Sequence, residues 1–368
     1  MARRSRLRTV LLICLANALT FALAFAAGEF GLRWYREGGI LSAVDSLLRR
    51  SSPSSHLATN NWLVRDPELG YKLKPRDGVN SFGIRHEEIG PNRQPGVSRA
   101  LVIGDSVAFH KDGFVTLLRE LMNETQQARI EVVNASVPGY TTFQERRFLE
   151  RDLLVLRPDL VILQYCLNDN HRFLHKLAPG GQWLVTQEAR QALFTEGEGW
   201  LARLSNSSYL LLEIRTRIAL LKTKWRDRFP WEGKGDFYPA WQDETWVDFE
   251  GHVRSMRNEL ANIGAKFAVV AVPFEPQMRQ DLSDSERTYA LKPQEHLAII
   301  CSDLGIPLLD LFDVFVENRH RDLFRSDGIH LTPSGHEITA ARLLGFIEEE
   351  ELLTQASLRP GVLQASDL

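Results

Sequence analysis

Residues 100–107, Ala-Leu-Val-Ile-Gly-Asp-Ser-Val, decide the fold of this chain of 368 residues. An apolar run followed by Gly-Asp predicts a short buried strand that ends in a turn. Ser106 stands directly after this turn. A serine at such a place caps the N-terminus of a helix in many proteins, and it can equally present a reactive hydroxyl at the end of a strand. The stretch alone leaves both interpretations open.

Strands and helices alternate along the rest of the sequence. Apolar runs predict further strands at Ile130–Asn134, Asp159–Tyr165, Lys266–Val272 and Ile306–Leu309. Helical periodicity indicates helices at Gly113–Asn123, Phe143–Leu156, Val247–Ile263, Gln294–Leu304 and Gly335–Glu350. Repeated β-α units of this kind predict an α/β fold, in which a parallel five-stranded sheet is covered by helices on both faces.

One long segment interrupts this alternation. Residues 170–250 separate the third strand from the fourth, and a simple crossover needs far fewer. Within the segment, Ser207–Lys222 predicts an amphipathic helix with a basic face. Tryptophans are concentrated there, and they either pack the insertion together or offer aromatic faces to sugar rings. They are Trp183, Trp200, Trp225, Trp231, Trp241 and Trp246.

Four polar clusters fall where the predicted strands end. Parallel strands have their carboxyl ends at one edge of the sheet, which is where α/β proteins bind ligands. We therefore expect the clusters to lie close together, although they are far apart in sequence. They are Gly104-Asp105-Ser106, residues 134–139, Asn168-Asp169 and Asp327-Gly328-Ile329-His330.

These clusters contain the groups that acyl transfer through a serine requires. A hydroxyl that attacks a carbonyl must lose its proton to a base, and the base needs an orienting carboxylate. Ser106 supplies the hydroxyl, His330 the imidazole and Asp327, three residues earlier, the carboxylate. The developing oxyanion needs fixed donors. Candidates are the backbone N–H groups of Ser106 and Gly139 and the side-chain amide of Asn168.

The four motifs in this order resemble the SGNH (GDSL-type) serine hydrolase superfamily over roughly residues 98–348. The resemblance implies a flavodoxin-like three-layer domain. It also implies that Ser106 is the nucleophile, His330 the base and Asp327 its partner, with Ser106, Gly139 and Asn168 forming the oxyanion hole. The lead-in Asn80–Arg85 and the amino-terminal segment resemble a membrane-anchored bacterial subgroup associated with extracellular polysaccharide and its O-acylation.

The sequence departs from the family pattern at two positions. Cys166 occupies the place of a glycine two residues before Asn168, and Val107 replaces a common leucine after the serine. Other polar residues at this edge have plainer interpretations. We expect Asp169 to cap a turn and His336 to pack near the start of the last helix. Substrate contact stays open for His171 and His175, which follow the third strand; His110 also lies near this edge.

The amino terminus predicts a membrane segment. An apolar run from Thr9 to Ala27 is long enough to cross a bilayer. Basic residues before it would stay in the cytoplasm and direct the rest of the chain outward. A cleaved signal peptide is the alternative, because Ala24-Phe25-Ala26 fits a cleavage site, and a buried cytoplasmic helix is a third. The basic residues are Arg3, Arg4, Arg6 and Arg8.

Composition narrows the range of functions. A net charge of -3 gives no overall basic field for nucleic acid. Three cysteines are too few for a disulfide framework or a zinc site, and we expect Cys166 and Cys301 to be buried free thiols rather than a bridge. No metal ligand set or cofactor motif is present in the sequence. We expect residues 1–36 to be an anchor or signal, 37–97 a linker and lead-in, 98–350 the hydrolase-like domain and 351–368 a tail.

Three functions follow as hypotheses. The first is a membrane-anchored, extracytoplasmic serine esterase that removes acyl groups from a carbohydrate or other ester. The second is an O-acyltransferase that uses the same residues to modify an exported polysaccharide. The third is a non-catalytic scaffold of a membrane-associated assembly. Hydrolysis and transfer differ only in whether water or a sugar hydroxyl accepts the acyl group.

Overall fold

The computed structural model describes most of the chain. It covers residues 2–37, 62–76, 78–125, 129–172, 175–177, 183–185 and 237–353, and the single positions 40, 44, 208, 210, 211 and 214. Much of the first part of the expected linker, most of the predicted helix Ser207–Lys222 and residues 354–368 lie outside these ranges. The described residues form two compact units, one containing the amino-terminal helix and the other the central sheet.

A five-stranded parallel sheet forms the centre of the larger unit. Its spatial order is β4-β3-β5-β8-β9, which corresponds to 2-1-3-4-5 among these strands in sequence and is the flavodoxin-like order. The order reverses at β3, since the chain proceeds from β3 to one neighbour and then to the other. The strands are β3 Val97–Ile103, β4 Arg129–Asn134, β5 Leu160–Tyr165, β8 Lys266–Ala271 and β9 Leu308–Asp310.

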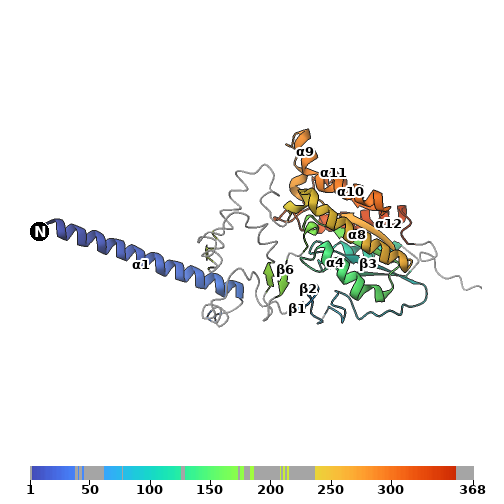
Figure 1. Cartoon of the computed structure of the whole chain (residues 1–368), viewed down its shortest axis with the longest axis horizontal. Coiled ribbons are helices and arrows are strands. Elements are labelled where there is room, and N and C mark those ends of the chain that lie inside the picture. The colour runs from blue at the N-terminus through green and yellow to red at the C-terminus, as the bar shows by residue number, and fades with distance from the viewer. Residues whose placement is uncertain are drawn as a thin grey trace, which may run out of the picture. The chain divides into compact units, whose positions relative to one another are not determined.

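Helices cover both faces of the sheet, so the predicted three-layer α/β fold is confirmed. On one face, α3 (Phe114–Thr125) packs beside α12 (Pro333–Glu349) over the buried side chains of the strands. On the other, α8 (Asp243–Asn262) lies against α4 (Thr142–Phe148), as Figure 1 shows. β5 is buried at every residue because both of its faces are covered. The remaining helices are α9 Asp284–Ala290, α10 Lys292–Leu304 and α11 Phe312–Glu317.

The segment before β3 differs from the sequence-based expectation. Its pattern predicts no regular structure, but β1 (Leu63–Asp66) and β2 (Gly70–Leu73) form an antiparallel hairpin. Asp66 closes the hairpin by accepting the backbone N–H groups of Glu68 and Leu69. Tyr71 then donates to the Pro138 carbonyl at 2.7 Å, so the hairpin supports the loop that follows β4.

The helix predicted over Phe143–Leu156 also changes form along its length. α4 passes into a π-helical turn at Leu149–Leu153 and a 3₁₀ turn at Leu154–Leu156. Short 3₁₀ turns also occupy Leu167–Asn170, Tyr238–Trp241 and Glu275–Met278. Two of the tryptophans from the long insertion, Trp241 in the second of these turns and Trp246 in α8, are buried. Their burial fits packing rather than an exposed aromatic platform. A second two-stranded sheet joins β6 (His175–Leu177) to β7 (Trp183–Val185).

The smaller unit contains α1, a helix over Ala2–Glu37. Within α1, Leu15–Trp34 has a mean hydropathy of 1.4, and by length and composition it is the one described helix that could cross a membrane. Glu29 and Arg33 form a buried ion pair at 2.8 Å near the end of this segment. Glu29 also accepts hydrogen bonds from the Ser208 hydroxyl and the Leu210 backbone N–H.

Candidate active site

The turn after β3 presents Ser106 at the point where the strand order reverses. Gly104 packs so closely on Gln164 that an added Cβ would lie 2.7 Å from the side-chain oxygen of Gln164, which explains why a glycine stands there. Asp105 then holds the turn, because its carboxylate accepts the Val107 N–H at 2.9 Å and its carbonyl accepts the Phe109 N–H at 3.1 Å. The Ser106 side chain is left half-buried at the carboxyl edge of the sheet.

A second loop brings the predicted histidine and carboxylate to this serine. His330 Nε2 lies 2.9 Å from Ser106 Oγ, and His330 Nδ1 lies 2.7 Å from Asp327 Oδ2. This pattern assigns the Nδ1–H tautomer, with Nε2 free to accept the serine proton. Residues separated by 224 positions, Ser106 and His330, are therefore joined with Asp327 in one hydrogen-bonded chain.

The loop also holds Asp327 in its ionised form. Its other oxygen, Oδ1, accepts the backbone N–H groups of Ile329 and His330, both at 2.9 Å. Partial burial by itself raises the pKa of Asp327, but the hydrogen bond from His330 and these two backbone bonds outweigh it, so the pKa lies below its ordinary value. A negative carboxylate on Nδ1 stabilises the imidazolium that forms when His330 takes a proton.

Two neighbouring histidines are held neutral by their surroundings. His110 Nε2 accepts a hydrogen bond from Arg325 at 2.6 Å, and burial together with this cation lowers the pKa of His110. His336 stacks on His110, and its Nδ1 accepts the Phe114 N–H at 3.2 Å. Burial lowers the pKa of His336 to about 4, and it packs at the start of α12 as expected. Among these three histidines, only His330 is hydrogen-bonded to the serine.

The loop after β4 places Gly139 beside β3. Val137 donates to the Gly104 carbonyl at 2.9 Å, which ties this loop to the serine turn. Gly139 has φ of 74°, a left-handed conformation that favours glycine and turns the chain sharply. The structure thus brings the second predicted oxyanion donor to the same edge as Ser106.

Asn168 reaches this edge from the 3₁₀ turn after β5. Its amide nitrogen donates to the Tyr140 carbonyl at 3.2 Å, and its side chain is buried. The amide oxygen has no hydrogen-bond partner among the described residues. Asp169 accepts the Cys166 N–H at 2.8 Å and so caps the turn, as the sequence suggests. The Asn168 side chain also hydrogen-bonds to the Asp105 carboxylate, whose pKa this bond lowers. An amide has two N–H groups, so the bonds to Tyr140 and Asp105 together fix its orientation beside Ser106.

A buried acidic group below the site was missed by sequence reasoning. Burial raises the pKa values of Glu145 and Asp169 well above the ordinary range, and it also raises that of Asp105. Repulsion from Asp169 and Asp105 adds to the shift of Glu145, and repulsion from Asp105 adds to the shift of Asp169. Both carboxyl oxygens of Glu145 lack a partner among the described residues. No signal of this burial is present in the sequence, because Gln144-Glu145 in an amphipathic helix predicts a face exposed to solvent. No set of three His, Cys, Asp or Glu side chains in the described ranges is arranged to hold a metal.

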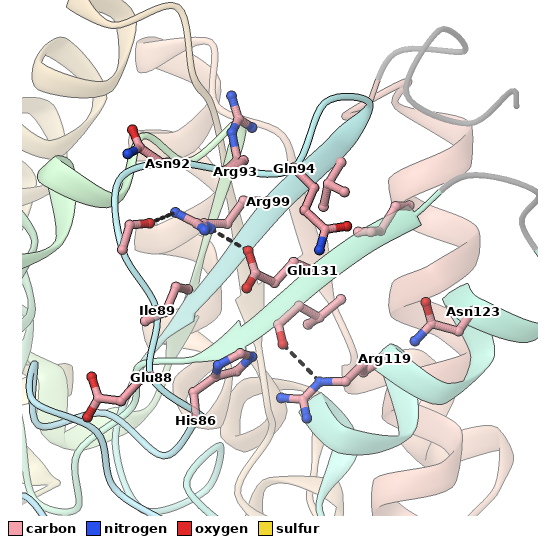
Figure 2. Close-up of a pocket in the computed structure, with 14 residues that line it drawn as sticks. His86, Glu88, Ile89, Asn92, Arg93, Gln94, Arg99, Arg119, Asn123 and Glu131 are labelled. Atoms are coloured by element: carbon pink, nitrogen blue, oxygen red, sulfur yellow. Dashed lines mark hydrogen bonds and ion pairs between the residues drawn. The ribbon is translucent and has the colours of Figure 1, made fainter. Parts of the chain in front are cut away.

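Two cavities of contrasting chemistry adjoin the central sheet. An apolar cavity of about 10 Å³ is walled by Val107, Cys166, Leu167, Phe237, Val272, Pro273, Phe274 and Ile329. We call it the apolar cavity. A second one, the arginine cavity, has about 460 Å³ and lies beside the amino-terminal halves of β3 and β4 (Figure 2). Its lining includes Arg93, Arg99, Arg119 and Glu131. Cys166 and Cys301 are both free and buried.

Comparison with solved structures gives distant likenesses of similar coverage. They include a lipase/acylhydrolase from Enterococcus faecalis, with 13% identity over 69% of this chain and 96% of that chain and a TM-score of 0.40. The acetyl xylan esterase AlAXEase has 15% identity over 67% and 98%, with a TM-score of 0.41. A catalytic mutant of an acetylxylan esterase from Geobacillus stearothermophilus has 15% identity over 68% and 94%, with a TM-score of 0.42. Likenesses at this level carry no conclusion about substrate.

A comparison with curated proteins yields no match. The model of the GDSL-like lipase/acylhydrolase family matches residues 102–338, a span that begins in β3 and ends in α12. It therefore includes all four polar clusters at the carboxyl edge of the sheet. With most of its length matched, the chain belongs to the GDSL-like lipase/acylhydrolase family, whose members hydrolyse esters.

Proposed function

We propose that this ester hydrolase uses Ser106 as its nucleophile, with His330 as general base and Asp327 as the group that orients it. The observation that carries the proposal is the continuous chain of hydrogen bonds from Ser106 Oγ through both nitrogens of His330 to Asp327. A serine hydroxyl is a weak nucleophile until a base within hydrogen-bond reach takes its proton. The 2.9 Å contact provides that reach.

The reaction proceeds through an acyl-enzyme. Ser106 Oγ bonds to the ester carbon while its proton passes to His330 Nε2, and the carbonyl oxygen becomes an oxyanion. The N–H groups of Ser106 and Gly139 and the side-chain amide of Asn168 stabilise this charge. The ester C–O bond then breaks, and His330 returns the proton to the departing alcohol. Water repeats the sequence and releases the carboxylic acid.

We further propose that the enzyme works outside the cytoplasm on an acylated carbohydrate. Support comes from the apolar stretch Leu15–Trp34 of α1 and the arginines that precede it, which fit an anchor with an exported domain. On this proposal residues 1–36 anchor the chain and residues 98–350 carry the chemistry. Protease added to intact spheroplasts should degrade the larger unit, while protection of that unit would place it in the cytoplasm. The mass of the mature amino terminus distinguishes an anchor from a signal cleaved near Ala26.

The direct test of function uses the full-length protein in detergent. Acetylated xylo- or glucosaminyl-oligosaccharides are supplied with and without an unacetylated acceptor, and both free acetate and acetylated acceptor are measured. Release of acetate that depends on Ser106 supports the esterase. Acyl transfer to the acceptor that outpaces release would show an O-acyltransferase instead. If the protein forms neither product and does not hydrolyse aryl esters, only the scaffold role would remain.

A further inference from the structure

The apolar cavity lies among the residues that flank the catalytic groups. Val107 follows the proposed nucleophile, Leu167 precedes Asn168, and Ile329 precedes His330. These wall residues come from the carboxyl ends of β3 and β5 and from the loop before α12. The cavity is therefore bounded in part by three segments of the proposed site, and Phe237 and residues 272–274 after β8 form the rest of its wall.

The geometry of acyl transfer leaves one direction for the acyl chain. The carbonyl oxygen must face the oxyanion donors, and the departing oxygen must face His330 Nε2, which protonates it. The third substituent of the carbonyl carbon, the acyl group, must point elsewhere. Between Asn168 and His330 the wall is apolar, since Leu167 and Ile329 line the cavity there. An alkyl group gains by burial on that side.

We propose that the apolar cavity binds the acyl group of the substrate, that its size restricts this group to acetyl, and that Cys166 and Phe237 set the limit. This inference rests on the proposed function, because it names the acyl group that Ser106 transfers. It also gives the end of the long insertion a role, since Phe237 closes the cavity from the segment just before α8.

The volume of the apolar cavity limits the size of the acyl group. A space of about 10 Å³ accepts roughly one sphere of the size of a water molecule. A methyl group is comparable in size, whereas each further methylene must displace a wall. The walls are firm, because Cys166 is 5% exposed and Phe237 is 4% exposed. Phe237 also packs edge-to-face on Phe274, with ring centroids 5.3 Å apart.

Cys166 suits this role as an inert wall residue. It is a free thiol, and burial raises its pKa well above the usual range, so the sulfur stays neutral and apolar. Its backbone has φ of -131° and ψ of 159°, an extended conformation that alanine or glycine adopts without strain. Shortening this side chain enlarges the cavity, and it also removes the sulfur that accepts the Asp169 backbone N–H at the start of the turn that carries Asn168.

The test compares acyl chain lengths with the full-length protein in detergent. Values of kcat/KM are measured for p-nitrophenyl acetate, propanoate and butanoate and divided by the rates of alkaline hydrolysis. We expect the wild type to prefer acetate over butanoate by at least about 10-fold, the range that one methylene commonly produces. Cys166→Ala and Cys166→Gly should reduce this preference progressively, by about 10-fold or more for glycine. Phe237→Leu should reduce it as well.

Cys301→Ala is the matched control. It removes the sulfur of the other buried cysteine, which lies in α10, so the acetate preference should remain at the wild-type value. The preference is a ratio, and partial unfolding lowers both rates alike without moving it. A structural effect of Cys166→Ala is thereby separated from a change in the cavity.

Two results would overturn the inference while leaving the proposed function intact. One is a wild-type enzyme that hydrolyses butanoate as fast as acetate through Ser106. The other is an acetate preference that Cys166→Gly and Phe237→Leu both leave unchanged. Absence of any Ser106-dependent turnover, with all three esters, would instead overturn the proposed function and this inference with it.

Discussion

The two cavities adjoin the central sheet at opposite ends of its strands, and they differ in size and in chemistry. The arginine cavity has about 460 Å³ and the apolar cavity about 10 Å³. In the larger one, Arg99 donates to Glu131 and to the Gly90 carbonyl (Figure 2). Arg99 also donates to the Leu156 carbonyl, and Arg93 pairs with Asp159. These charges are already compensated by the protein itself. The smaller cavity instead adjoins Ser106, His330 and Asp327, the groups that we propose to act on a bound substrate.

This difference separates architecture from catalysis. Buried charges with fixed protein partners stabilise the packing of loops around β3 and β4, since an unpaired buried ion would destabilise the fold. A group that reacts must instead keep its reactive atom accessible to the substrate, as the half-buried Ser106 does with its hydroxyl oxygen. Substitutions at the amino-terminal halves of the strands should therefore change stability, and substitutions at their carboxyl ends should change turnover.

Ser106→Ala should produce the largest effect at the carboxyl end. Loss of the nucleophile is expected to reduce kcat for p-nitrophenyl acetate by about 10⁴-fold. The hydroxyl is half-buried and contributes little packing, so the melting temperature should stay within about 2 °C of wild type. Ser136→Ala is the matched control, because Ser136 is a buried serine at the same edge with only a long contact to the Val102 carbonyl. Equal loss in both variants would argue against a special role for Ser106.

Asn168→Ala tests the proposed oxyanion donor. We expect kcat to fall by roughly 10²- to 10³-fold with KM little changed, because the interaction is made in the transition state. Asn170→Ala, two residues away in the same turn, is the control. It removes the acceptor of the Tyr165 hydroxyl and so affects stability rather than kcat. A rise in KM alone for Asn168→Ala would indicate ground-state binding instead.

Arg99→Met should show the reverse pattern at the amino-terminal end. It leaves Glu131 and two backbone carbonyls without their donor, which is expected to lower the free energy of unfolding by about 3 kcal/mol. Urea denaturation measures this change, and kcat per folded molecule should remain at the wild-type value. Arg119→Met removes only the bond to the Val132 carbonyl and should destabilise by about 1 kcal/mol. A specific loss of kcat in either variant would break the separation between the two ends.

Glu145→Gln should have the smallest effect on turnover at neutral pH, and it should reveal the buried acidic group through the pH dependence of stability. A carboxyl whose folded pKa is raised stabilises the fold below its ordinary value of 4.5, and that stability is lost as pH rises toward the folded pKa. Within this window the wild type should lose about 1.4 kcal/mol for each pH unit. Glutamine does not titrate, so the variant should gain on the wild type as pH rises above 4.5. Parallel curves of unfolding free energy against pH would contradict this.

The sheet could be predicted from the sequence because its strands contain short apolar runs, such as residues 100–103, 160–163 and 267–271. Burial on both faces leaves such runs no polar alternation, and they stand out from their surroundings. The hairpin of β1 and β2 could not be predicted. Leu63–Asp66 has its two middle residues exposed, so a strand of this length shows no clear period. Its stability comes from distant contacts such as that between Tyr71 and the Pro138 carbonyl.

The residues of the candidate site could be predicted from the sequence, but the buried groups and the cavity around them could not. Ser106, Asp327 and His330 stand in short motifs whose roles in chemistry are recognisable from residue type and spacing. Glu145 was missed because a glutamate in an amphipathic helix ordinarily faces water, and only the fold shows it buried beside Asp169. The apolar cavity was likewise hidden, since its walls come from segments as distant as Val107 and Ile329.

The most direct test of the central claim is covalent labelling of the full-length protein with a fluorophosphonate probe, followed by mass-spectrometric mapping of the modified peptide. The account predicts one label per chain on Ser106, lost in Ser106→Ala and strongly slowed in His330→Ala, in which the base is removed. Absence of labelling in the folded wild-type protein, or a label that maps to a serine other than Ser106, would contradict it.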